Sequence, residues 1–213
     1  MYKIGVVLMA ALCLAVPTLA QGWSEYFNGG GLFPWGQIDR LAPPSICMGW
    51  DYNYNIVDGS DPRGNFSTGD GGAAHIDTDA RVSGSGAYDK ILTSPAFIVP
   101  SGASLSFVAN YQPLNNDSFS VLLSKDGFTS WNTLATYTAA VGTFPTYPYT
   151  ANVALGQSIT LDLSPYEGQN AQIGFRYAGN GWNWWAQVDN IVVTPEPASF
   201  VLLALAGLTL RRR

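Results

Sequence analysis

The chain has 213 residues, of which 47% are hydrophobic, so it is long enough to bury the core of one domain. It carries 15 acidic and 10 basic residues, a formal net charge of −5. Nucleic acid phosphates need a basic surface, so this balance excludes nucleic acid as an expected partner.

Residues 1–20 have the pattern of a secretory signal peptide. Lys3 supplies one positive charge, residues 4–15 form an apolar stretch, and small residues lead up to Ala20. We therefore expect a signal helix that is cleaved after Ala20, and a mature protein that is exported.

The part between the signal and the tail, residues 21–194, is strongly acidic. Lys3, the three C-terminal arginines and Glu196 lie outside it, which leaves six basic and fourteen acidic residues inside. Twelve of these fourteen acids are aspartate, which suits turns and calcium sites better than helices. Cys47 is the single cysteine of this part and excludes an internal disulfide; it is either a small buried hydrophobe or half of an intermolecular bridge.

The first half of residues 21–194 is rich in glycine, aspartate and asparagine. Residues 29–72 predict long loops with one or two short strands. Asp77 and Asp79 follow, spaced so that both side chains would lie on one side of a strand and could share a cation, although solvated loop aspartates are the alternative. His75, the only histidine, is expected near the end of a strand.

The second half alternates apolar and polar residues with a period of two, the pattern of half-buried strands. The apolar positions are Leu105, Phe107, Ala109 and Tyr111; Phe119, Val121 and Leu123; Ile159, Leu161 and Leu163; and Ile173, Phe175 and Tyr177. Shorter strands are expected at 88–92 and 96–99, and a surface excursion at 143–154. No helical period extends over three turns, so the pattern predicts an all-β fold of two packed antiparallel sheets.

The last strand, within residues 181–193, changes its parity. Trp182 and Trp184 share one face with Ala186 and Val188, and the apolar positions after Asp189 have the other parity. This predicts a β-bulge near Asp189, or a strand end that is buried on both faces. Trp182 and Trp184 are then expected in the core, and Trp185, of opposite parity, on the surface as a platform for a ligand.

The tail, residues 195–213, combines Pro195, Glu196 and Pro197 with an apolar run at 198–210 and three final arginines. The run is short for a membrane span, because 13 helical residues reach only about 20 Å. The tail resembles the PEP-CTERM sorting signal of Gram-negative bacteria. The resemblance implies a short hydrophobic helix held transiently in the inner membrane, cleavage by an exosortase, and release to the cell surface or the extracellular matrix. A permanent tail anchor and a buried terminal helix are the alternatives.

Several segments in order carry a second resemblance. They are residues 88–95 (YDKILTSP), 105–107, 121–124, 161–169 (LDLSPYEGQ), 173–177 and 188–193 (VDNIVV). Together they resemble bacterial choice-of-anchor J domains, which are similar to cleaved-adhesin and MAM-type jelly rolls. The resemblance implies an antiparallel jelly-roll β-sandwich. It also implies a structural calcium ion (Ca²⁺), with Asp189 as the acid of the last strand, Glu25 as the early acid and Asp51 as a further ligand.

No catalytic constellation is evident. A single histidine allows no histidine-rich metal centre, no nucleophile elbow is present, and the two glutamates of the mature part, Glu25 and Glu167, lie in no recognisable catalytic context. The sequence thus predicts a non-enzymatic surface protein with a structural or adhesive role. The alternative is a carbohydrate-binding module for an extracellular polysaccharide, with Trp182, Trp184 and Trp185 as candidate ligand contacts.

Overall fold

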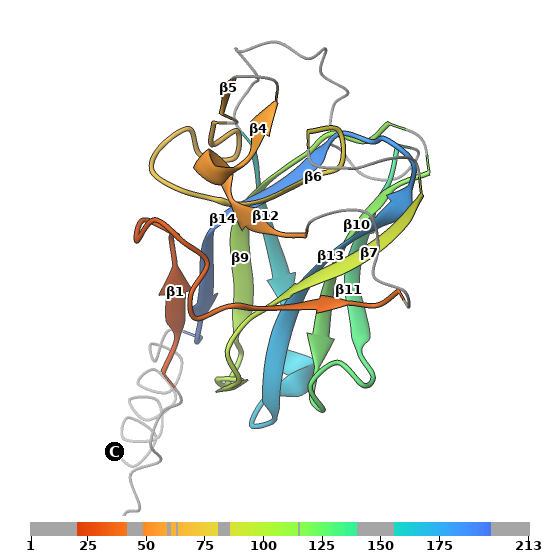
Figure 1. The fold of residues 1–213 in the computed structure, drawn as a ribbon. Helices are drawn as coiled ribbons and strands as arrows, with labels where there is room; N and C mark the ends of the chain where they lie inside the picture. Colours follow the sequence, from red (N-terminus) through yellow and green to blue (C-terminus); the bar gives the residue numbers. More distant parts are fainter. Residues whose placement is uncertain are drawn as a thin grey trace, which may run out of the picture.

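Two antiparallel sheets pack face to face in the computed structural model (Figure 1), which describes residues 21–41, 49–58, 61–62, 64–80, 86–114, 116–139 and 156–196. Each sheet has six strands, and every pairing between strands is antiparallel. The predicted all-β sandwich is confirmed.

The first sheet is organised around the last strand. Its order is β12 (Gln157–Asp162), β9 (Ser104–Tyr111), β14 (Trp185–Thr194), β6 (Ala74–Asp77) and β3 (Asp51–Tyr52), and β1 (Trp23–Glu25) pairs with the C-terminal half of β14. Strands β1 and β6 thus lie one after the other along β14, so the segments just before and just after residues 29–72 both pair with that strand.

The second sheet is organised around β13. Its order is β11 (Asn132–Tyr137), β10 (Ser118–Ser124), β13 (Asn170–Asn180), β7 (Ala87–Thr93) and β2 (Gly36–Asp39), and β8 (Phe97–Ile98) also pairs with β13. The remaining elements are a two-stranded ribbon of β4 (Val57–Asp58) and β5 (Asp61–Pro62) and two 3₁₀ turns, η1 (Asn53–Asn55) and η2 (Ser164–Tyr166). Residues 29–72 therefore hold four short strands where one or two were expected, because strands of two to four residues are too short to show a period.

The core lies between the sheets and consists of the alternating positions read from the sequence. The side chains of β9, β10 and β13 at these positions are all buried. Phe107 of the first sheet meets Phe175 of the second edge to face, with ring centroids 5.1 Å apart. Burying each large apolar side chain contributes roughly 1.5–3 kcal/mol, so these aromatic layers hold the sandwich together.

The predicted bulge in β14 is confirmed. The pairing of β14 with β9 shifts between Asp189 and Val192, and Asn190 takes a φ of 50°. Ile191 and Val193 thereby face the core, as do Ala186 and Val188 before the shift.

The predicted environments of the tryptophans near β14 are wrong. The strand begins only at Trp185, so Trp182 and Trp184 lie in the preceding turn, where strand parity does not apply; Trp182 is 62% exposed and Trp184 is half-buried. Trp185 does have the opposite parity to the core, but it is fully buried. Its face of the sheet is covered by residues 64–72, and Phe66 packs on it with ring centroids 5.0 Å apart.

Several predictions fall outside the described residues. These are the signal helix at 1–20, Cys47, the excursion at 143–154, and the tail from Pro197 onward. Pro195 and Glu196 are described, and the Glu196 N–H donates to the carbonyl of Ser101 at 3.1 Å. Among the helices of the described part, none is long and apolar enough to cross a membrane.

Candidate functional site

Asp189 lies on the outer face of the first sheet, beneath the loop of residues 64–72, and is only 1% exposed. Its carboxylate accepts hydrogen bonds from the Thr68 hydroxyl at 2.6 Å, the Asn65 amide at 3.1 Å and the Asn190 N–H at 2.7 Å. Burial raises the pKa of Asp189 above the ordinary aspartate value, the three hydrogen bonds lower it in part, and the negative charge of Glu25 raises it further. The site therefore disfavours a bare negative charge.

The side chain of Asn65 reveals an excess of oxygen atoms beside Asp189. Its Oδ1 accepts from Ser67 N–H, Ser67 O–H and Thr68 N–H, which fixes the orientation of the amide. Its Nδ2 then lies 2.8–3.1 Å from four oxygens: the Thr68 hydroxyl, the carbonyls of Asp70 and Gly72, and the Asp189 carboxylate. An amide nitrogen carries only two hydrogens. The Asn65 amide can therefore donate to two of these four oxygens at one time, and the other two are left without a hydrogen bond from it.

Glu25 joins this cluster from β1. The register of β1 on β14 pairs Glu25 with Ile191, two residues from Asp189. Its Oε1 accepts from the N–H groups of Tyr26 at 3.0 Å and Phe27 at 2.8 Å, and its charge acts on Asp189. The early acid and the last-strand acid thus lie on neighbouring strands and interact electrostatically. We call Glu25, Asn65, Thr68, Asp189 and the carbonyls of Asp70 and Gly72 the oxygen cluster.

The other three acids lie apart from it. Asp51 is on β3, two strands from β14, and binds its own Tyr52 N–H and the Asn55 amide. Strand β6 ends at Asp77, which is buried and accepts from the N–H groups of Asp79 and Ala80, while Asp79 is exposed in the turn. The two therefore do not share one side of a strand, and the geometry from which a common cation was expected is absent. Within the described ranges, no group of three or more histidine, cysteine, aspartate or glutamate side chains is arranged to hold a metal.

A glutamine on β14 holds the loop over the cluster. Gln187 accepts from Phe66 N–H at 2.6 Å and lies within hydrogen-bond distance of the Gly64 carbonyl and of His75 Nδ1, at 2.8 and 3.0 Å. His75 is the second residue of β6, near one end of that strand as predicted, and is fully buried. The polar outer face of β14 between Trp185 and Asp189 is therefore an interior surface, covered by residues 64–72.

A second buried network fixes the turn that carries Trp182. Thr78 and Asn183 exchange two bonds, from Asn183 N–H to the Thr78 hydroxyl at 3.0 Å and from that hydroxyl to the Asn183 carbonyl at 2.7 Å. The Asn183 amide also donates to the Tyr88 hydroxyl at 2.7 Å, and burial raises the pKa of Tyr88 to about 12. The turn thus presents the exposed Trp182 from a rigid base.

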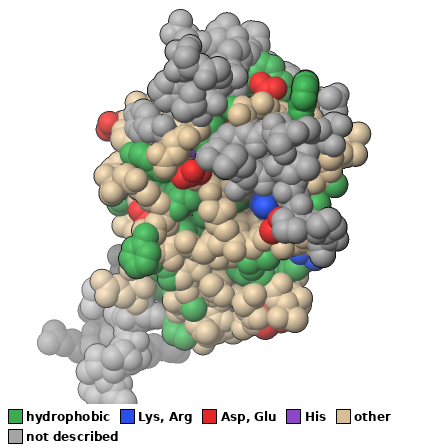
Figure 2. All heavy atoms as spheres, in the orientation of Figure 1, with side chains coloured by type: hydrophobic (Ala, Val, Ile, Leu, Met, Phe, Trp, Pro, Cys, Tyr) green, Lys and Arg blue, Asp and Glu red, His purple; other side chains and the backbone are tan. Residues whose placement is uncertain are grey.

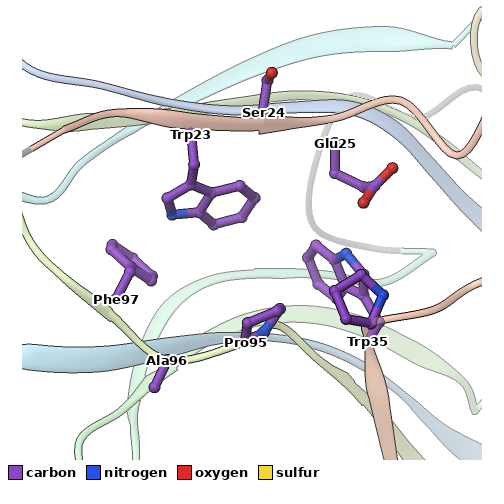
Figure 3. A pocket seen from close by; sticks show the side chains of 8 residues that line it. Trp23, Ser24, Glu25, Trp35, Pro95, Ala96 and Phe97 are labelled. Atoms are coloured by element: carbon purple, nitrogen blue, oxygen red, sulfur yellow. The ribbon is translucent and has the colours of Figure 1, made fainter.

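A third feature is an aromatic cleft between the edges of the two sheets, with a volume of about 360 Å³. Trp23 and Glu25 of β1 lie on one side, Pro95, Ala96 and Phe97 on the other, and Trp35 beside them (Figure 3). Sequence reasoning missed this cleft, because its walls come from segments far apart in the chain.

Sequence reasoning also missed half of the oxygen cluster. Asn65 and Thr68 had a local signal, because asparagine followed by serine and threonine favours a turn in which the side chain caps backbone N–H groups. The carbonyls of Asp70 and Gly72 had no signal, since any residue carries one.

Comparisons with known proteins identify the fold by its similarity to solved structures. No family model matches the chain. Hemagglutinin A of Porphyromonas gingivalis (strain ATCC BAA-308 / W83) is 29% identical over 120 residues, which are 52% of this chain and 6% of that protein. The chain therefore spans only a small part of this relative.

Solved structures share the architecture. The K1 and K3 cleaved adhesin domains of Lys-gingipain (Kgp) from Porphyromonas gingivalis W83 both superpose with a TM-score of 0.59, at 18% and 17% identity; they cover 83% and 81% of this chain and 99% and 98% of their own. The Caldicellulosiruptor saccharolyticus module CBM27-1, solved in complex with mannohexaose, has a TM-score of 0.50 at 15% identity and covers 84% of this chain and 99% of its own. The protein thus has the adhesin-like jelly-roll fold.

Proposed function

We propose that the chain is a non-enzymatic adhesive module of the bacterial cell surface or extracellular matrix, and that its partner is an extracellular polysaccharide. The observation that carries this proposal is Trp182, whose ring is 62% exposed on a turn fixed by buried hydrogen bonds. The apolar C–H faces of sugar rings pack on such indole faces, and a rigid platform loses little entropy on binding. The adhesin and carbohydrate-binding structures that share the fold support the same role.

The proposal is tested by retardation of the protein in gels that contain polysaccharides, extended to a glycan array. We expect Trp182→Ala to abolish retardation by any polysaccharide that retards the wild type. The matched control is Phe33→Ala, because Phe33 is an aromatic residue that is 94% exposed elsewhere on the surface. Retardation that survives Trp182→Ala, or the absence of binding to every glycan tested, would contradict the polysaccharide partner.

We further propose that the oxygen cluster holds a structural calcium ion. Ca²⁺ takes six to eight oxygen ligands, and the cluster offers carboxylates, a hydroxyl and backbone carbonyls. The Asn65 amide, surrounded by more acceptors than it has hydrogens, occupies a place where a cation is favoured. Asp189, Glu25, Thr68 and the carbonyls of Asp70 and Gly72 would hold the ion, which would offset the charges of the two acids.

Thermal unfolding tests this calcium site. We expect calcium to raise the melting temperature of the wild type and of Glu167→Gln, whose side chain is exposed in a loop, but not that of Asp189→Asn. At a calcium concentration one hundred times the Kd, the gain is about 2.7 kcal/mol. An equal response of Asp189→Asn and the wild type would place the ion elsewhere.

We propose, finally, that the tail from Pro195 is a sorting signal cleaved by an exosortase after transient retention in the inner membrane. The order of the Pro-Glu-Pro triplet, the short apolar run and the arginines supports this fate. Mass spectrometry of the protein from its native envelope should find a chain that starts at Gln21 and ends near Pro195. Recovery of the intact arginine tail would contradict cleavage.

A further inference from the structure

The aromatic cleft lies between β1 of the first sheet and the segment that leads into β8 of the second. Trp23 stands on its β1 side, facing Phe97 and Trp35 (Figure 3). The exposed fraction of Trp35 is small, so its ring is a fixed wall of the cleft. The space is lined mostly by carbon.

The rings of the cleft are set nearly at right angles. The ring of Trp23 makes an interplanar angle of 72° with Phe97 at 5.4 Å and of 68° with Trp35 at 6.0 Å. Because the rings contact one another edge to face, they form adjoining walls that meet at a corner. A flat ligand can stack on one wall, whereas a compact, rounded group seated in the corner can touch more than one. The arrangement of the walls therefore favours a group without a preferred plane.

The charge of the lining has one sign. Glu25 is the one ionisable residue among the eight that line the cleft, and the two backbone N–H groups of Tyr26 and Phe27 hold its carboxylate. Figure 2 shows acidic side chains on several parts of one face of the molecule and basic ones on few, in keeping with the excess of acids between residues 21 and 194. A cation is thus attracted at long range and met by a carboxylate inside.

The lining also offers few hydrogen-bonding groups. Apart from Glu25, Ser24 and the indole N–H groups of the two tryptophans are its polar side-chain groups, and the Ser24 hydroxyl points away from the rings in Figure 3. A sugar would lose the hydrogen bonds that its hydroxyls make with water and find few replacements. An alkylated ammonium group has no hydroxyls to satisfy and is attracted to the faces of aromatic rings.

We propose that the aromatic cleft binds a compact organic cation, a methylated ammonium group of the kind carried by choline. The rings of Trp23, Trp35 and Phe97 supply the cation–π surface, and Glu25 supplies the counter-charge. This site needs neither Trp182 nor a polysaccharide, but it shares Glu25 with the calcium site proposed above, so choline binding is measured in EDTA.

The decisive experiment compares choline with its neutral carbon isostere, 3,3-dimethylbutan-1-ol, in titrations of the full chain followed by tryptophan fluorescence. The two molecules have the same shape and differ in charge. We expect choline to bind at least about tenfold more tightly than the isostere, because a desolvated cation–π contact and a carboxylate together exceed 1.4 kcal/mol. Equal affinities would overturn the proposal, since burial alone would then explain the binding.

Variants assign the site. Trp23→Leu and Glu25→Gln should each weaken choline binding about threefold to thirtyfold, and Glu167→Gln, the other glutamate between residues 21 and 194, should leave it unchanged. Because Glu25 also belongs to the oxygen cluster, Asp189→Asn is the second control and should keep choline affinity in EDTA. Loss of binding in Asp189→Asn, or retention in both Trp23→Leu and Glu25→Gln, would overturn the assignment.

Vesicles distinguish the source of the group. Retention of the protein on phosphatidylcholine vesicles but not on phosphatidylglycerol vesicles, with choline as competitor, would assign the cation to a lipid headgroup. Binding of free choline without retention would assign it to soluble ammonium compounds. Absence of both would refute the proposal.

Discussion

Two buried aspartates, Asp117 and Asp189, differ in how their hydrogen-bond donors are shared. Asp117 is 2% exposed and receives donors: its carboxylate accepts from Leu114 N–H at 3.1 Å and from the Tyr177 hydroxyl at 3.2 Å. Asp189 is buried to the same degree and accepts from three donors, but two of them, the Asn65 amide and the Thr68 hydroxyl, are shared with the carbonyls of Asp70 and Gly72.

The difference separates a structural acid from a ligand. A buried charge is tolerated when donors satisfy it, and donors around Asp117 complete a network of tyrosines at the end of the sandwich. The pKa of Tyr177 is raised well above its ordinary value, because the ring is buried and Asp117 adds a negative charge nearby. The donors to Asp189 are neutral, and two of them are shared with backbone carbonyls; calcium would supply a positive partner.

The largest loss of stability is expected on substitution of Trp185, which lies between the surroundings of Asp117 and those of Asp189. The Trp184 carbonyl accepts from the Tyr177 hydroxyl at 3.3 Å, and the Trp185 ring packs on Phe66 and donates to Asn110 at 2.9 Å. Trp185→Ala should therefore lower the free energy of unfolding by about 3–5 kcal/mol, and Trp182→Ala by less than about 0.5 kcal/mol. Urea denaturation measures both, and similar losses would refute the assignment of one as core and the other as surface.

The next effect contrasts the two acids directly. In EDTA, Asp117→Ala leaves two buried donors without a charged acceptor, each bond worth about 1.5–3 kcal/mol, so we expect a loss of about 3 kcal/mol or more. In Asp189→Ala the Asn65 amide and the Thr68 hydroxyl keep the Asp70 and Gly72 carbonyls as acceptors, so its loss should be less than half as large. If the two variants lose equal stability without calcium, the contrast between the two sets of donors is wrong.

A smaller effect is expected in the pH dependence of stability. The folded protein raises the pKa of Asp189 above the unfolded value of 3.8, so the folded state binds this proton more tightly. Without calcium, the wild type should gain stability relative to Asp189→Asn as the pH falls through the raised pKa, and the gain is complete below the unfolded value. Urea denaturation in EDTA between pH 7 and pH 4 gives this difference, and a change of the opposite sign would show a carboxylate stabilised by its surroundings.

The sequence predicted those parts of the fold in which one strand face meets the core. The alternation in β9, β10 and β13 identified their buried residues, and the change of parity after Asp189 identified the bulge. It failed where a loop covers the other face: Trp185 has the predicted parity, but residues 64–72 shield it from solvent. Strand parity shows on which face of the sheet a side chain lies, and tertiary packing decides whether that face is exposed to solvent.

The sequence predicted some residues of the candidate sites and not others. Asp189 and Glu25 came from the resemblance to jelly-roll domains, and the strand register brings them together. The carbonyls of Asp70 and Gly72 carry no sequence signal, and the walls of the aromatic cleft lie on β1, β8 and the loop before β2. Such groups become neighbours only through strand pairing over long sequence separations.

The most direct measurement is isothermal titration of calcium into the wild type, Asp189→Asn and Glu167→Gln after removal of bound ions with EDTA. The oxygen cluster predicts one site in the wild type and in Glu167→Gln, and none in Asp189→Asn. Absence of calcium-dependent heat in the wild type, together with an unchanged melting temperature, would contradict the site; so would binding that survives in Asp189→Asn.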